Sequence, residues 1–301
     1  MTAAVVVECG DELGECPVWD PNRSELLWTD IHGRRLHRLG TDGSTVDVAL
    51  DDRLCSFAVT TEGDLLAAFT KQLVRLDRVS GAARDLQAIE PDLAATRCND
   101  GRPDRHGGFV FGTMDERNEP RQPLGSFHHW HVEHGVTVIR PGVLVSNGLC
   151  FSPDGLTIHY ADSPLGTIWK ARYDPGTGEI HDERVLVGPD PGVPGDTGSP
   201  DGSAVDAEGC IWNARWGAWG VARFTPDGAL DTIIDVPVPQ PSAVTFGGDD
   251  LGTLYITTGR EHMQPGDARY ELSGSLFAVT PGVAGIADTP VTQVDQFLIE
   301  A

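Results

Sequence analysis

Residues 146–155 read SNGLCFSPDG, and the Asn of this stretch, Asn147, precedes Asp154 of a Pro-Asp-Gly turn by seven positions. Ser-Pro-Asp-Gly is a common turn sequence, because Pro restricts its own backbone while Asp and Gly accept the conformations of a tight turn. A β-rich run, LTIHY, follows the turn at once. The same order of polar residue, turn and β-rich run recurs along the chain, and this recurrence decides the predicted fold.

Five other segments share the template of an apolar residue, a turn and a β-rich run. They are VWDPNRSELLWTD (18–30), VTTEGDLLAAF (59–69), PDRHGGFVFGT (103–113), VDAEGCIWNA (205–214) and FGGDDLGTLYIT (246–257). With the residues around Asp154 they make six repeats, whose turns are roughly 40 to 54 residues apart. Regular spacing of this kind is typical of repeat architectures, in which each unit packs against its neighbours.

A second motif follows each repeat. It is a strand that ends in a Gly-containing turn, such as RRLHRLGTDG (34–43), and then another β-rich run, such as STVDVAL (44–50). Each unit therefore comprises about four short strands joined by hairpins. We predict an all-β fold, a six-bladed β-propeller of four-stranded blades, as a single domain over residues 1–301. Residues Ala3–Glu8 are expected to complete the blade begun at the other terminus. The alternative is a pair of β-sandwiches, which does not account for six matched repeats.

Equivalent positions of a propeller lie at one height around its axis, so the residue seven positions before each turn is expected to face the tunnel mouth. This ring consists of Glu15, Cys55, Asn99, Asn147, Asp201 and Ser242. Its two carboxylates repel each other if nothing lies between them, and Arg97 is the only nearby basic residue that the sequence suggests. Carboxylate and amide oxygens are natural ligands of a hard or borderline divalent cation. The spacing alone leaves two interpretations open, a metal centre and a water-filled polar channel.

Composition restricts the partners. The chain has 45 acidic and 22 basic residues, a formal net charge of −23, which repels phosphate backbones and makes nucleic acid a poor partner. The N-terminus, MTAAVVVECGDELGE, has neither a basic segment nor an apolar run long enough for a signal peptide or a membrane span. We therefore expect a cytoplasmic protein without a membrane partner. The six cysteines form no CxxC pair, which favours buried free thiols.

Four stretches of the chain resemble the SMP-30/gluconolactonase/regucalcin family, and bacterial sugar lactonases most closely. They are GECPVWD (14–20), RCNDGRPDRHGGFVFGTM (97–114), SNGLCFSPDG (146–155) and SPDGSAVDAEGCIW (199–212). The resemblance extends over nearly the whole chain. It implies a six-bladed propeller with one divalent metal ion at the tunnel mouth, held by Glu15, Asn147 and Asp201. It also implies that Arg97 and Asn99 contact the substrate.

The implied reaction is the hydrolysis of a sugar lactone, a small cyclic ester, to the open aldonic acid. In it, the cation polarises the lactone carbonyl, and Asp201 acts as a general base or as a ligand only. Oxygen ligands accept Ca²⁺, Zn²⁺, Fe²⁺, Mn²⁺ or Mg²⁺, so the metal stays open, as do the preferred lactone and the oligomeric state. Two alternatives are an esterase or phosphotriesterase on the same centre and a non-catalytic propeller that binds calcium or a partner.

Some features depart from the family pattern or lack a clear role. Cys16 stands where the family frequently has Gly, and Glu116 is the nearest match to an acidic substrate contact of the regucalcin branch. The Gly- and Pro-rich loop 191–200 precedes Asp201 and is a candidate for shaping the pocket. The run HHWH (128–131) resembles a zinc-ligand sequence, but neighbours in a strand point to opposite faces, which favours a place on the surface or packing between blades. The chain lacks a G-x-S-x-G elbow, a dinucleotide fingerprint and a Walker loop.

Overall fold

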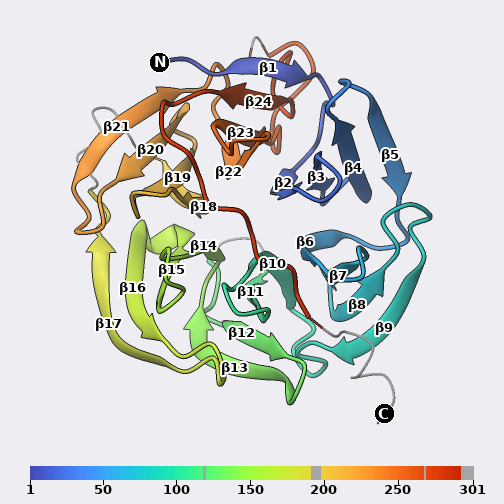
Figure 1. Cartoon of the computed structure of the whole chain (residues 1–301), viewed down its shortest axis with the longest axis vertical. Coiled ribbons are helices and arrows are strands. Elements are labelled where there is room, and N and C mark those ends of the chain that lie inside the picture. Colours follow the sequence, from blue (N-terminus) through green and yellow to red (C-terminus); the bar gives the residue numbers. More distant parts are fainter. Residues whose placement is uncertain (118–119, 191–197, 268, 293–301) are drawn as a thin grey trace.

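The structure is a computed structural model, and it describes residues 1–117, 120–190, 198–267 and 269–292. Six antiparallel four-stranded sheets stand around a central axis like the blades of a propeller (Figure 1). This arrangement confirms the predicted fold. Besides the strands, the described residues contain one short 3-10 helix, η1 (Ser163–Leu165).

Each blade is a meander in which the strand order follows the sequence. The first three blades are β2 (Gly14–Asp20), β3 (Glu25–Asp30), β4 (Arg35–Gly40), β5 (Thr45–Ala49); β6 (Leu54–Val59), β7 (Leu65–Phe69), β8 (Gln72–Leu76), β9 (Ala83–Ala88); and β10 (Thr96–Pro103), β11 (Phe109–Asp115), β12 (Gly125–His131), β13 (Gly135–Val143). The next two are β14 (Ser146–Phe151), β15 (Thr157–Asp162), β16 (Thr167–Tyr173), β17 (Ile180–Val187); and β18 (Ser199–Val205), β19 (Ile211–Trp216), β20 (Gly220–Phe224), β21 (Leu230–Asp235).

The sixth blade joins the two ends of the chain. It consists of β22 (Pro241–Gly247), β23 (Thr253–Thr258), β24 (Leu276–Val279) and, as its outermost strand, β1 (Ala4–Val7). Strand β1 pairs antiparallel with β24, with Ala4 opposite Ala278 and Val5 opposite Phe277. The N-terminal residues therefore close the ring as expected, and the closure ties the last blade to the start of the chain.

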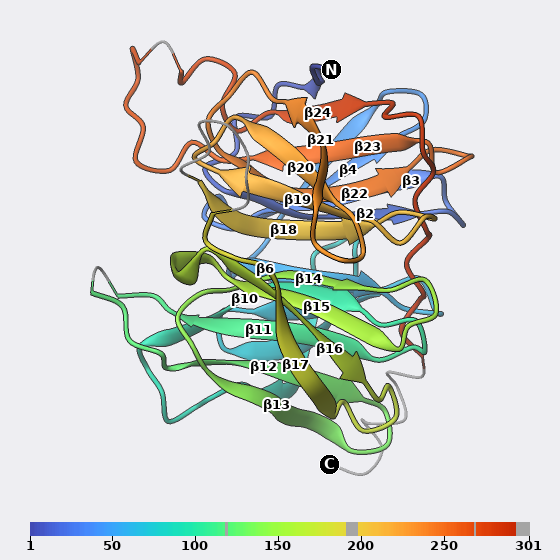
Figure 2. The ribbon, with the colours of Figure 1, turned by 90° about the vertical axis from the view of Figure 1, so that its left-hand side faces the viewer.

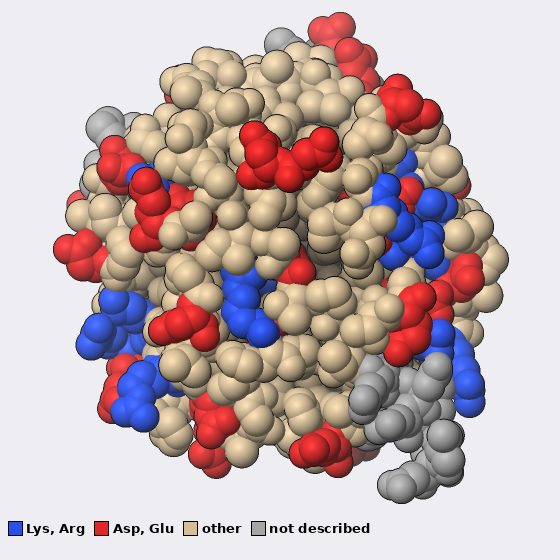
Figure 3. Space-filling view, in the orientation of Figure 1, with Lys and Arg blue, Asp and Glu red and all other residues tan. Residues whose placement is uncertain are grey.

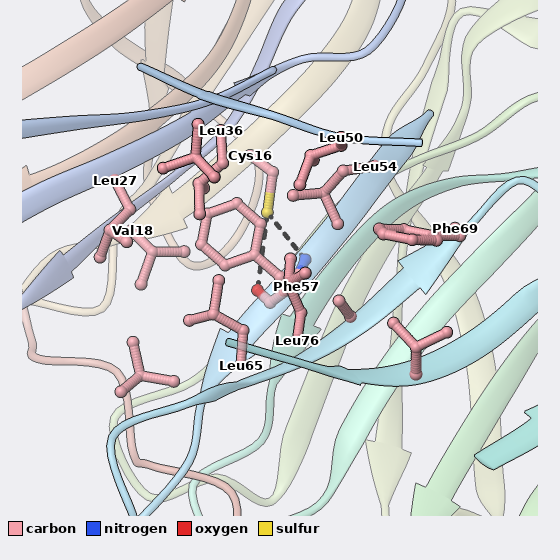
Figure 4. Close-up of a cluster of buried hydrophobic side chains, with 14 residues drawn as sticks. Cys16, Val18, Leu27, Leu36, Leu50, Leu54, Phe57, Leu65, Phe69 and Leu76 are labelled. Atoms are coloured by element: carbon pink, nitrogen blue, oxygen red, sulfur yellow. Dashed lines mark hydrogen bonds between the residues drawn. The ribbon is translucent and has the colours of Figure 1, made fainter. Parts of the chain in front are cut away.

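The hydrophobic core lies between neighbouring blades. Inner strands such as β2, β6 and β14 are buried along their whole length, whereas outer strands such as β5 and β17 are mostly exposed. Figure 4 shows one core cluster, in which Phe57 lies among leucines of the first two blades, including Leu27 and Leu65. Burying a side chain of this size contributes roughly 1.5–3 kcal/mol, so contacts of this kind hold adjacent blades together.

The chain after β24 crosses the face of the ring that Figure 1 presents, and Figure 2 shows it running along that edge of the molecule. Its backbone bonds to three blades: Ala284 O accepts from Ala207 N, Gly285 N donates to Leu251 O, and Val291 N donates to Val59 O, each at 2.9 Å. The segment therefore lies across the end of the tunnel that is opposite the first residues of the inner strands.

Figure 3 shows the same face with acidic side chains spread around it and basic ones in smaller groups, in keeping with the net charge of −23. All six cysteines are free, and five are buried, as expected. No helix in the described part of the chain has the length and apolar character needed to cross a membrane.

Candidate metal centre and active site

A β-bulge marks the predicted ring position in every blade. The pairing between the inner strand and the second strand shifts register at Glu15/Val18, Leu54/Ser56, Cys98/Gly101, Asn147/Cys150, Pro200/Ser203 and Pro241/Ala243. A bulge bends its strand and re-aims the side chains beside it. Each ring residue lies within or beside one of these shifts, so the sequence offset of seven corresponds to one recurring backbone feature at the tunnel mouth.

The two carboxylates of the ring are almost completely buried. Glu15 on β2 is 8% exposed and Asp201 on β18 is 6% exposed. Burial, together with the charge of Asp100, raises the pKa of Glu15 to about 8. Burial, followed by the charges of Glu15 and Asp100, raises the pKa of Asp201 well above its usual range. Two carboxylates therefore resist ionisation here unless a cation lies beside them.

Hydrogen bonds across a blade boundary orient the amides of the ring. Asn99 on β10 donates through Nδ2 to Asn147 Oδ1 at 3.0 Å and to Ser146 O at 2.8 Å. Asn147 donates through Nδ2 to Ser163 Oγ at 2.7 Å, and that hydroxyl donates to Pro200 O at 2.7 Å. The Asn147 side chain is thus held by Asn99 at its oxygen and by helix η1 at its nitrogen.

Arg97 lies on β10 beside Asn99 and is 5% exposed. Its Nη1 donates to Asn99 Oδ1 at 2.7 Å and to Cys98 O at 2.8 Å. Its Nε lies 3.6 Å from Glu116 Oε1, and Glu116 is also paired with Arg53. The structure therefore places Glu116 next to the arginine, whereas the sequence left its position open.

Ser242 and Cys55 complete the ring, and both are buried. Ser242 Oγ donates to Gly14 O, beside Glu15. Cys55 is a free thiol whose pKa burial raises to about 11, so it is protonated near neutral pH. These two ring positions therefore contribute a hydroxyl and a protonated thiol, and neither adds a negative charge to the mouth.

Several residues of the site were not singled out by the sequence as site residues. Asp100 accepts from Gly101 N at 2.8 Å and from Leu149 N at 2.9 Å, so it braces its own turn and also the neighbouring blade. Burial raises the pKa of Asp100, and the charge of Arg102, on the same strand, partly offsets this rise. Arg102 therefore compensates the charge of Asp100, whereas Arg97 is the basic residue whose charge acts on the ring carboxylate Glu15.

A second missed pair lies in the loops of the mouth. His32 Nε2 and Glu261 Oε1 are 2.5 Å apart, and Glu261 is close enough for its charge to contribute to the raised pKa of Glu15 and of Asp201. A lone His and a lone Glu in separate loops give no sequence signal, because only the ring closure brings them together. Residues 191–197 of the loop before Asp201 lie outside the described residues.

The backbone conformation at Cys16 is one that suits the Gly frequently found at this position in the family. Its backbone has a φ of 47°, in the left-handed region that favours glycine. This conformation turns its N–H back to Glu15 Oε2 at 3.2 Å, and its Sγ lies 3.3 Å from Phe57 N (Figure 4). The bend at residue 16 therefore helps to orient the Glu15 carboxylate.

The donor set fits a divalent cation. Asp201 Oδ1 is buried and has no hydrogen-bond partner among the described residues. The Glu15 carboxylate lies close enough for its charge, after burial, to raise the pKa of Asp201, and Asn147 occupies the equivalent bulge of the neighbouring blade. No three His, Cys, Asp or Glu side chains of the described residues form a metal-binding group, so a cation here would also need a donor of another kind, such as an amide oxygen.

A six-bladed propeller with oxygen donors gathered at its mouth defines the class of this protein. The chain belongs to the family described as SMP-30/Gluconolactonase/LRE-like region, whose model matches residues 13–260. It is 35% identical over 293 residues to a 6-deoxy-6-sulfogluconolactonase of Pseudomonas putida, covering 95% of this chain and 97% of the relative. It is 36% identical to an L-arabinolactonase of Azospirillum brasilense, covering 94% and 90%. A calcium-binding protein, regucalcin, from Agrobacterium tumefaciens superposes with a TM-score of 0.88 at 30% identity, covering 97% of each chain.

Proposed function

We propose that this protein hydrolyses a sugar lactone to the open aldonic acid with the help of one divalent metal ion. The observation that carries the proposal is the pair of buried carboxylates at the ring positions of two blades, Glu15 and Asp201, which lie close enough for their charges to interact, with Asp201 Oδ1 unpartnered among the described residues. The names of the relatives support the substrate class, because both the sulfogluconolactonase and the arabinolactonase act on sugar lactones.

The three oxygen donors would hold the ion, and Arg97 and Asn99 lie beside them to contact the substrate. When bound, such a cation supplies Lewis acidity that polarises a carbonyl oxygen. It also favours the ionised form of both carboxylates, which burial alone disfavours. The amide of Asn147 adds no charge, so the centre remains electrophilic. Any of Ca²⁺, Zn²⁺, Fe²⁺, Mn²⁺ and Mg²⁺ accepts this donor set.

The residues of the chain account for the remaining steps. Arg97 presents its guanidinium at the mouth and is oriented by Asn99 Oδ1. It would hold a hydroxyl or the developing oxyanion of the lactone. As a water molecule adds to the carbonyl carbon, Asp201 accepts its proton. The bond from that carbon to the ring oxygen then breaks, the ring oxygen takes the proton from Asp201, and one water has been added overall.

The test measures acid released from a panel of γ- and δ-aldonolactones, using chelated protein reloaded with single metals. Spontaneous opening of the lactone is subtracted. The matched pair of variants is Asp201→Asn, at the mouth, and Asp154→Asn, in the exposed turn of another blade. We expect the first to lose at least 10²-fold in kcat/KM and the second to retain full activity. Equal activity of the two variants, both folded by circular dichroism, would contradict the proposal.

Two other functions share this centre. The similarity to a calcium-binding regucalcin favours a propeller that binds calcium without turnover. A cation that polarises a carbonyl also polarises a phosphoryl oxygen, which favours an esterase or phosphotriesterase. Aryl esters and organophosphates are therefore included in the panel. Calcium binding without hydrolysis of any compound by any metal form supports the first alternative, and a preference for aryl or phosphate esters supports the second.

A further inference from the structure

Two loops meet at the tunnel mouth, where the sixth blade adjoins the first. Strands β3 and β23 both end at the mouth, because each pairs antiparallel with an inner strand that begins there. The loop after β3 carries His32 and the loop after β23 carries Glu261, and His32 Nε2 lies 2.5 Å from Glu261 Oε1. Figure 1 shows β2 and β22 on one side of the ring and β10 and β14 on the opposite side. The pair therefore lies across the mouth from Arg97 and Asn147.

Both loops are anchored to the residues that precede Glu15. Ile31 N donates to Leu13 O at 3.0 Å, and Arg260 N donates to Glu12 O at 3.0 Å. Each of these two donors is the immediate neighbour in sequence of one member of the pair. The backbone that leads into Glu15 thus holds both loops, so the pair has a fixed place near this carboxylate.

The charge of Glu261 acts on the proposed metal centre. It contributes to the raised pKa of Glu15 and of Asp201. Burial opposes the ionisation of Glu261, but the hydrogen bond and charge of His32, followed by other charges that include Arg97, lower its pKa. Glu261 is therefore an ionised hydrogen-bond acceptor near neutral pH, within electrostatic reach of the residues on the other side of the mouth.

The pair has unused hydrogen-bonding atoms. The side chains of His32 and Glu261 are 22% and 25% exposed. Among the described residues, His32 Nδ1 and Glu261 Oε2 have no hydrogen-bond partner. A carboxylate oxygen accepts from a hydroxyl group, and an imidazole nitrogen accepts or donates according to its protonation. The two neighbouring side chains thus suit a ligand with two neighbouring hydroxyl groups.

An aromatic ring lies beside the loop that carries Glu261. A Cβ added at Gly259 would lie 3.0 Å from the ring of Trp216, so this ring packs against the glycine. Trp216 is half-buried at the end of β19 and packs against the core cluster that contains Leu13 and Ile31. Small-molecule sites typically combine aromatic surface with a few well-placed polar groups. This side of the mouth therefore suits a ligand that has both C–H bonds and hydroxyl groups.

We propose that His32 and Glu261 form a hydroxyl-binding subsite, which selects lactones with neighbouring hydroxyl groups over lactones that have none. This inference rests on the proposed function and names the part of the substrate that this side of the mouth recognises. With the carbonyl group directed to the oxygen donors and to Arg97, the hydroxyl groups on the other side of the lactone ring would reach the pair. A lactone without hydroxyl groups would cover these polar atoms without satisfying them, which weakens its binding.

The experiment compares kcat/KM for glucono-δ-lactone with kcat/KM for δ-valerolactone, which has the same ring size and no hydroxyl group. In Glu261→Ala and in His32→Ala, the ratio of the two values should fall at least about tenfold, mainly through a higher KM for the hydroxylated lactone. The matched control is Glu179→Ala, because Glu179 lies 3.5 Å from a histidine, His181, in an exposed pair of the fourth blade. The control should keep the wild-type ratio. An equal loss on both lactones would show that the pair only supports the mouth, and would overturn the proposal.

A binding titration separates this subsite from the proposed lactonase activity. Anhydroglucitol is a cyclic polyol without a carbonyl group, so it can bind without being hydrolysed. Ligand-observed NMR should show at least about tenfold weaker binding to Glu261→Ala and His32→Ala than to Glu179→Ala and the wild type, even if no lactone is ever hydrolysed. Equal binding by all four proteins, or no binding to the wild type, overturns the proposal. Because both side chains of the pair are partly exposed, both variants are expected to fold.

Discussion

The side chains of Asn99 and Asn147 are hydrogen-bonded across the boundary between the third and fourth blades, with Asn99 Nδ2 3.0 Å from Asn147 Oδ1. The residue expected to contact substrate therefore also holds a residue expected to contact the metal. Arg97 extends the connection, since it donates to the other end of the Asn99 side chain at 2.7 Å. The proposed substrate contact and the proposed metal ligand are thus linked through one amide.

Replacing Asn99 by Ala is expected to weaken both metal binding and lactone hydrolysis. Without the Nδ2 donor, the Asn147 carbonyl loses one of the two groups that orient its side chain. Losing such a supporting group commonly costs about 10–100-fold in metal affinity or activity. Calorimetric titration with Ca²⁺ and initial rates on the preferred lactone measure the two effects. A fall in activity with unchanged metal affinity would show that Asn99 contacts substrate only.

Adding a divalent ion to the chelated protein is expected to raise its melting temperature. The proposed ion would bind the folded mouth, where Glu15 and Asp201 are both buried, and the unfolded chain offers no such site. At about 100 times Kd, an ion that binds only the folded state contributes roughly 2.7 kcal/mol. Differential scanning calorimetry with and without Ca²⁺, Mg²⁺, Mn²⁺ or Zn²⁺ measures the shift. Asp201→Asn should reduce it, and an equal shift in that variant would place the ion elsewhere.

The repeats and the ring positions could be predicted because both are local in sequence. Turn residues and alternating apolar residues specify each hairpin, and the offset of seven locates Glu15, Asn147 and Asp201 at equivalent places. The supporting contacts could not be predicted in the same way. The approach of Asp100 to Leu149 N, or of His32 to Glu261, depends on how far each bulge turns its strand and on how neighbouring blades pack. The histidines of β12 are a further example. Strand alternation predicts that His129 and His131 share one face, but it does not predict that His134, from the following turn, lies beside them.

A buried ion-pair group joins the first two blades, and its loss is expected to destabilise the fold. Arg78 is 1% exposed; its Nη2 lies 2.7 Å from Asp20 Oδ2 and its Nη1 3.4 Å from Glu25 Oε2. Its Nε also donates to Gly63 O at 2.6 Å. Arg78→Met leaves two carboxylates with less compensation, so the free energy of unfolding should fall by about 3–5 kcal/mol.

Urea denaturation measures the effect of Arg78→Met, and Arg172→Met is its matched control. Arg172 pairs with Asp182 at 3.2 Å, but both side chains are largely exposed. Surface pairs contribute about 0–1 kcal/mol, so the control should remain close to the wild type. Equal losses in the two variants would mean that the buried group adds nothing beyond the aliphatic part of the arginine.

A buried neutral histidine is expected to make the protein sensitive to acid. His159 on β15 is 4% exposed, and burial, followed by the charge of Lys170, lowers its pKa to about 4. In the unfolded chain a histidine titrates near pH 6.5, so between about pH 6.5 and 4 only the unfolded state binds the proton. The stabilisation is complete above pH 6.5, and about 3 kcal/mol of it is lost as the pH falls to 4. Urea denaturation at several pH values measures this. As the pH falls from 6.5 to 4, the free energy of unfolding of His159→Gln should rise relative to that of the wild type by about 3 kcal/mol. The free energy of unfolding of His181→Gln, at an exposed position, should change as that of the wild type does. Parallel curves for the wild type and His159→Gln would show that this histidine takes up its proton without unfolding the blade.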